Sequence, residues 1–93
     1  MRLVSINPAT ARQIASHRGH TRAEVERAVA RAHTAHLAWR KLTPKVRAKH
    51  LRAVGRGLLA RREQLATLAT TEMGKPVKQA RTEVEKSALA CEF

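Results

Sequence analysis

The sequence has little of what stabilises small secreted or membrane proteins. Its 93 residues include one cysteine, Cys91, which excludes an internal disulfide and is typical of a reducing compartment. No apolar run approaches the roughly 20 residues needed to cross a bilayer. Near the start, Asn7 and Pro8 interrupt the short apolar stretch, so no signal peptide is indicated. We therefore expect a cytoplasmic protein without a membrane partner.

Large apolar side chains are also scarce. Trp39 and Phe93 are the only aromatic residues, and much of the 43% apolar content is alanine. Alanine surfaces contribute little, because burial stabilises by roughly 25 cal/mol per Å² of apolar area. A domain of this size buries only about 60–70% of its unfolded surface. We expect the chain to be marginally stable or partly molten by itself.

Acidic residues are few. There is no aspartate, and seven glutamates stand against 19 lysines and arginines, which gives a net charge of +12. Such a charge is compatible with a nucleic-acid-binding module, but no aromatic platform for bases flanks the basic residues. We interpret them as solvated helix faces and expect weak, non-specific polyanion binding that salt removes. They include Arg18, Arg22, Arg27, Arg31, Arg40, Lys45, Arg47, Lys49, Arg52, Arg56, Arg61 and Arg62.

The first residues read as a short β-hairpin over residues 3–16. Two extended apolar segments flank a turn-rich stretch from Asn7 to Arg12. Asn7 is pushed away from helix by the following proline, and Pro8 suits the second position of a turn. A polar connector around Gly19 follows the hairpin.

A helix is predicted over residues 21–42. Thr21 and Glu24 have the spacing of a capping box, in which each side chain accepts a hydrogen bond from the other residue's backbone N–H. Apolar residues then recur at three- and four-residue steps and form one stripe. Trp39 is the largest of them, so we expect it to anchor the packing of this helix.

Helical pattern resumes over residues 44–73. Thr43 is the predicted cap, and Pro44 occupies the first helical position, where its missing N–H costs nothing. Two internal glycines each cost about 1 kcal/mol relative to alanine, and nearly thirty residues is long for one helix of a globular domain. We therefore predict a break near residues 60–63, which gives two consecutive helices.

A tight corner follows, and a last helix is predicted over residues 76–93. Gly74 suits the left-handed position that ends many helices, and Pro76 suits the first position of the next one. The pattern reaches Phe93 without a stop signal, as expected of a chain truncated at its C-terminus. The apolar stripe of this helix comprises Val77, Ala80, Val84, Ala88 and Cys91.

Three motifs occur in the order and spacing of a known family. They are Ile6-Asn7-Pro8-Ala9-Thr10, Ala38-Trp39-Arg40 and Glu72-Met73-Gly74-Lys75-Pro76, the last followed by Gln79-Ala80-Arg81 and Glu83-Val84-Glu85-Lys86. Together they resemble the first third of NAD(P)-dependent aldehyde dehydrogenases, and the succinate-semialdehyde type is the most similar. The family usually carries Gly-Glu where this chain has Ala11-Arg12. Because alanine tolerates positive φ poorly, this departure puts the turn geometry in question.

The resemblance implies a fold class and a chemistry. This chain would be mostly α, a short N-terminal β-hairpin followed by three to four helices, and residues 1–93 would open an α/β, Rossmann-like cofactor-binding domain. Family members oxidise an aldehyde through a cysteine-bound thiohemiacetal, pass hydride to NAD or NADP, and hydrolyse the thioester with a glutamate base. The family's residues for these steps lie beyond position 93. We therefore expect no catalytic or cofactor-binding residue here, no activity of the chain alone, and a homo-oligomer only in the full-length parent.

Other candidate sites have simpler structural explanations. His17 with His20, and His33 with His36, have a spacing that zinc ligands use, but no cysteine or aspartate is near them in sequence, so we predict no metal site. Gly74-Lys75 lacks the first glycine and the Ser/Thr of a phosphate loop. Cys91 lies on an apolar helical stripe, where a cysteine usually acts as a small hydrophobe.

The glutamates form no acid–base pair by sequence. Glu83 and Glu85 are two residues apart on a helix and face different directions, and Glu72 has no predicted partner. Two alternatives to an inactive dehydrogenase part remain open. One is a small basic helical module that binds nucleic acid or another polyanion, and the other is a chain that associates with full-length relatives and disturbs their assembly.

Overall fold

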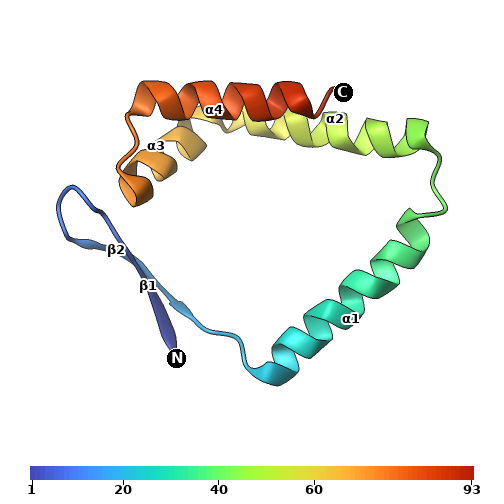
Figure 1. Ribbon diagram of the computed structural model, residues 1–93, viewed down its shortest axis with the longest axis horizontal. Coiled ribbons are helices and arrows are strands. Elements are labelled where there is room, and N and C mark those ends of the chain that lie inside the picture. Colours follow the sequence, from blue (N-terminus) through green and yellow to red (C-terminus); the bar gives the residue numbers. More distant parts are fainter.

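The computed structural model describes all of residues 1–93 and contains two strands and four helices (Figure 1). The predicted fold class, a short hairpin followed by helices, is confirmed. In chain order, the elements are β1 (Arg2–Ile6), β2 (Gln13–Arg18), α1 (Arg22–Trp39), α2 (Pro44–Ala60), α3 (Arg62–Met73) and α4 (Val77–Ala90).

Strands β1 and β2 form an antiparallel hairpin. Arg2 lies opposite Arg18 at the open end, and the register shifts between Ser5 and Ile6 close to the turn. The hairpin is nearly all solvent-exposed on both faces. It therefore contributes backbone hydrogen bonds but almost no buried apolar surface.

Helix α1 begins as predicted but stays largely uncovered. The Thr21 side chain accepts from the Glu24 N–H at 3.2 Å, and Glu24 accepts from the Thr21 N–H at 2.7 Å. No residue of α1 is buried. Trp39 is not the buried packing anchor that was expected, because it is 38% exposed. Its ring lies beside that of His50, with centroids 5.5 Å apart, and it lines a shallow hollow with Leu51 and Phe93.

Helices α2 and α3 meet at the predicted break. The backbone of Arg61 leaves the helical region there, with φ −107° and ψ 17°. Thr43 caps α2 by accepting from the Val46 N–H at 3.3 Å, and Pro44 is the first helical residue. Local signals were therefore sufficient to predict both ends of α2.

Helix α4 runs antiparallel alongside α2 and also packs on α3 (Figure 1). Gly55 permits a close approach of α4, because a Cβ there would lie 3.0 Å from the Ala88 carbonyl oxygen and 3.1 Å from the Cys91 Cβ. The only other buried residues of the chain are three alanines, Ala66, Ala80 and Ala88. The core is therefore a narrow packing contact between small residues.

The molecule is a flat, open arrangement. Its Cα atoms extend 48 × 36 × 14 Å, and its radius of gyration is 17.2 Å, whereas a compact domain of this length has about 12 Å. Among the helices, the main packing is that of α4 on α2 and α3. No helix is both long and apolar enough to pass through a membrane.

Candidate functional site

Two of the resembling motifs, far apart in sequence, meet in space. The hairpin turn reaches the corner between α3 and α4 (Figure 1). The Ser5 hydroxyl donates to Glu72 Oε1 at 3.2 Å, and a Cβ on Gly74 would lie 3.2 Å from Cγ of Pro8. We call the contact of these four residues the hairpin–corner junction. This junction connects the N-terminal hairpin to the C-terminal helices, and it gives the Glu72 carboxylate a hydrogen-bond partner.

The corner itself depends on Gly74 and Pro76. Gly74 has φ 72° and ψ 12°, and its N–H donates to the Thr70 carbonyl at 3.0 Å, which is the left-handed helix end that was predicted. The prediction for Pro76 was off by one residue. Pro76 has φ −55° but ψ 133°, so it caps the helix and Val77 is its first residue. The proline ring fixes φ, whereas ψ stays free to direct the chain around the corner.

The hairpin turn is retained despite its unusual residue. The Asn7 side chain accepts from the Ala9 N–H at 2.9 Å, and the Asn7 N–H donates to the Arg12 carbonyl at 2.9 Å. Ala11 has φ 61°, and it is the one non-glycine residue of the chain with positive φ. The turn therefore keeps a geometry that favours glycine and carries strain of roughly 1–2 kcal/mol at this alanine.

Ion pairs connect the last two helices and the corner. Lys75 pairs with Glu83, Arg62 pairs with Glu85 at 2.7 Å, and Arg81 pairs with Glu63 at 3.0 Å. All of these side chains are at least partly exposed, so each pair contributes little to stability. Arg62 also lies 3.5 Å from Glu63, so Glu63 and Glu85 share one arginine. Each of these carboxylates is paired with a cation at the surface, and no arrangement for general acid–base catalysis is formed.

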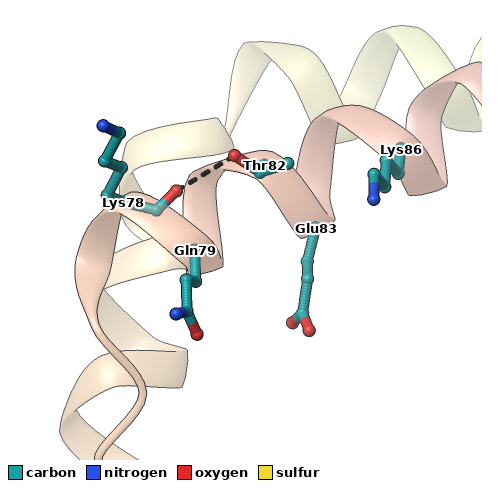
Figure 2. Close-up of a pocket in the computed structure, with 5 residues that line it drawn as sticks. All are labelled: Lys78, Gln79, Thr82, Glu83 and Lys86. Atoms are coloured by element: carbon teal, nitrogen blue, oxygen red, sulfur yellow. Dashed lines mark hydrogen bonds between the residues drawn. The ribbon is translucent and has the colours of Figure 1, made fainter.

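A polar hollow of about 360 Å³ lies along α4 (Figure 2). Its lining residues are Lys78, Gln79, Thr82, Glu83 and Lys86. The Thr82 hydroxyl donates to the Lys78 carbonyl at 3.1 Å, while Gln79 and Glu83 extend to one side of the helix and Lys78 points away from them. All five side chains come from one helix and none is apolar, so the hollow lacks the opposing walls of a substrate pocket.

Cys91 lies at the end of α4 and is only partly buried. The structure confirms the apolar stripe that precedes it, because Ala80 and Ala88 are buried, but the helix ends at Ala90. Cys91 is the helix cap and its Cβ faces Gly55. No histidine pairs with its thiol, so the base that activates a nucleophilic cysteine in many enzymes is missing.

The histidines are not gathered into a ligand set. Nowhere in the chain do three or more His, Cys, Asp or Glu side chains lie close enough together to hold a metal ion. His50 instead stacks at a tilt of 50° against Trp39. The prediction that the chain carries no catalytic, cofactor or metal residue stays a prediction.

One carboxylate is electrostatically distinct. Arg18 donates two hydrogen bonds to Glu24, at 2.9 and 3.0 Å, and the Thr21 backbone N–H adds a third. The Arg18 guanidinium, followed by the Thr21 N–H, lowers the pKa of Glu24 below its ordinary value. This cluster connects the end of β2 to the start of α1. The capping box was visible in the sequence, but the arginine partner was not.

Comparison with known proteins agrees with the motifs that meet at the junction. The chain belongs to the aldehyde dehydrogenase family, whose sequence profile it matches over residues 1–93.

The relatives include semialdehyde dehydrogenases. The chain is 41% identical over 90 residues to the NAD(P)+ succinate semialdehyde dehydrogenase Sad of Escherichia coli, which covers 97% of this chain and 20% of that protein. It is 38% identical over 87 residues to the mitochondrial succinate-semialdehyde dehydrogenase of Oryza sativa, and this match covers 94% of the chain and 16% of that protein. It is 39% identical over 84 residues to the N-succinylglutamate 5-semialdehyde dehydrogenase of Burkholderia mallei, and this match covers 90% of the chain and 17% of that protein. The chain therefore spans a fifth or less of the length of these relatives.

Proposed function

We propose that this chain is the N-terminal part of the cofactor-binding domain of an NAD(P)-dependent aldehyde dehydrogenase, and that it supplies supporting helices and no reactive group. The scarcity of buried side chains is the observation that carries the proposal. Stable domains bury the apolar faces of their elements against other layers, whereas the only buried residues of this chain are Gly55, Ala66, Ala80 and Ala88. The surfaces that cover the open faces would come from the rest of the dehydrogenase.

The exposed apolar side chains support this assignment. Val29 on α1 is 64% exposed, Val54 on α2 is 54% exposed and Met73 at the corner is 76% exposed. Two buried polar atoms, Arg47 Nε and Thr70 Oγ1, have no hydrogen-bond partner. Open apolar faces of this kind are what an interface that lacks its other half leaves exposed.

The proposed substrate is a semialdehyde that carries a carboxylate, with succinate semialdehyde first. The names of the E. coli and rice relatives support this choice, and that of the B. mallei relative keeps an N-succinylated semialdehyde as the second candidate. The reaction would convert the aldehyde and water to a carboxylate while NAD or NADP is reduced. A cytoplasmic location and assembly into a homo-oligomer belong to the same proposal.

A direct assay tests whether the chain is inactive alone. Purified chain is mixed with succinate semialdehyde and NAD or NADP, and absorbance of the reduced nucleotide is followed. We expect no turnover above that of a Cys91→Ala control, because the cysteine has no activating base. Turnover that this substitution abolishes would refute the proposal.

A graft tests the assignment to the family's N-terminal layer. Residues 1–93 replace the matching segment of the E. coli succinate semialdehyde dehydrogenase, and the chimaera is assayed for semialdehyde-dependent NAD(P)H formation. We expect a soluble, active enzyme, because the chain would supply the same supporting surfaces. A matched chimaera with Gly74→Val should lose most of the activity measured in the soluble fraction, because valine fits neither the positive φ nor the contact with Pro8. An inactive first chimaera, or two equally active ones, would contradict the proposal.

A further inference from the structure

A long central part of the chain carries positive charge only. No acidic residue lies between Glu26 and Glu63, so the basic residues from the middle of α1 to the end of α2 have no local partner. None of them forms an ion pair. They are Arg27, Arg31, Arg40, Lys41, Lys45, Arg47, Lys49, Arg52, Arg56 and Arg61.

Four of these charges lie in one row. Lys45, Lys49, Arg52 and Arg56 follow one another on α2 at steps of four, three and four residues, which places them on one side of a helix with 3.6 residues per turn. We call this row the α2 stripe. All four side chains are exposed. At 1.5 Å per residue the row is about 16 Å long.

The stripe stays accessible when α2 packs. The side that faces α4 is the side of Gly55, which is buried against Ala88. The exposed apolar residues Val46 and Val54 lie on a further side, which the proposed function assigns to the rest of the enzyme. Val54 lies on the side of the helix opposite the row. Gly55 lies beside the row, three residues from Arg52, and Arg52 lines a shallow hollow with Cys91, Glu92 and Phe93 at the end of α4. All four stripe side chains stay exposed with α4 in place.

The first turn of α2 adds a second reason to expect an anion. The positive end of the helix dipole lies there and favours negative charge, yet the first turn contains no acidic residue and Lys45 lies within it. A bound anion would offset both charges. Backbone phosphate groups bind well at such positions.

We propose that the α2 stripe binds the phosphate backbone of duplex DNA without reading its sequence. Duplex DNA has one negative charge per roughly 1.7 Å of its axis, so a straight row of cations meets phosphates along its whole length. Single strands are bound mainly through stacking on aromatic side chains, and the stripe has none. An anionic membrane would require the apolar side of α2 to insert into lipid, and that side is committed to the rest of the enzyme in the proposed function.

Two charge-matched variants test the proposal. The stripe variant carries Lys45→Gln, Lys49→Gln, Arg52→Gln and Arg56→Gln. The control variant carries Arg12→Gln, Arg27→Gln, Lys78→Gln and Lys86→Gln, four exposed residues outside the stripe that form no ion pair. Both variants lose the same net charge, and glutamine keeps the helix propensity of the lysines and arginines that lie on helices. Far-UV circular dichroism checks that the helices are intact.

Binding of a short random-sequence DNA duplex is measured by fluorescence anisotropy at several salt concentrations. Four phosphate contacts predict a slope of log affinity against log salt of about −3.6, which is a loss of roughly 150-fold in affinity between 50 and 200 mM salt. We expect the wild type and the control variant to share this slope. For the stripe variant we expect a slope close to zero. Equal losses in the two variants would show that dispersed charge alone binds DNA, and would overturn the proposal.

A third measurement distinguishes binding to DNA from binding to anionic membranes. Vesicles of phosphatidylserine and phosphatidylcholine are used in a co-sedimentation assay at the same salt. We expect little binding, and no difference between the stripe and control variants. Vesicle binding that exceeds DNA binding and depends on the stripe would also overturn the proposal.

Discussion

Gly74 is the residue on which the hairpin–corner junction depends most directly. It satisfies two requirements at once, a positive φ of 72° and space for the Pro8 ring. A side chain at this position would be disfavoured both by the positive φ and by the contact with Pro8. The neighbouring Ser5 to Glu72 hydrogen bond then holds the same two segments together from the other side.

We predict that Gly74→Ala lowers the free energy of unfolding by about 1–2 kcal/mol from the left-handed backbone alone, with the Pro8 contact adding to it. Urea unfolding followed by far-UV circular dichroism measures the change. Gly57→Ala is the control, because no atom lies within 4 Å of its Cβ position, and it should stabilise α2 by about 1 kcal/mol. Equal effects of the two substitutions would show that the corner geometry is wrong.

Glu24 provides a prediction about pH. Arg18 and the Thr21 N–H lower its pKa in the folded chain, so the stabilising effect of the carboxylate is fully present above the pKa of the unfolded chain. This effect is lost as the pH falls through the lowered pKa. NMR titration of the Glu24 carboxyl carbon should show the low value, and Arg18→Gln should raise it toward that of an ordinary glutamate. A value unchanged by Arg18→Gln would exclude the arginine as the main cause.

At the scale of elements, the local signals in the sequence predicted most of what forms. Thr21 and Thr43 begin helices, Gly74 ends one, and the break after Ala60 lies where it was expected. These features depend on neighbouring residues only, which is why a single sequence reveals them. The α2 stripe was also readable, because its spacing is helical, although the basic residues were interpreted only as solvated faces.

The packing of α2 on α4 yields a prediction from two glycines of the same helix. Gly55→Ala should weaken the contact, because the new methyl group would lie 3.0 Å from the Ala88 oxygen and 3.1 Å from the Cys91 Cβ. Overpacking of this kind typically costs about 1–3 kcal/mol. The urea midpoint of Gly55→Ala should therefore fall while that of Gly57→Ala rises. A rise for both would mean that α4 does not lie against Gly55.

At the scale of the whole molecule, contacts between distant residues were not predictable. Ser5 and Glu72 are 67 positions apart, and no local pattern joins them. The exposure of Trp39 was missed for a related reason. Periodicity shows that a helix has an apolar side, but it does not show whether another element covers that side. The flat shape of the chain is consistent with the expected marginal stability, which stays a prediction.

The central claim is that the rest of a dehydrogenase covers the apolar faces that this chain leaves open. Helix α1 is the most sensitive reporter, since none of its residues is buried in the chain by itself. Backbone hydrogen exchange of residues 22–39 is measured in the isolated chain and in the active chimaera. The account predicts rapid exchange in the isolated chain and strong protection in the chimaera. Equal protection of α1 in both would contradict it.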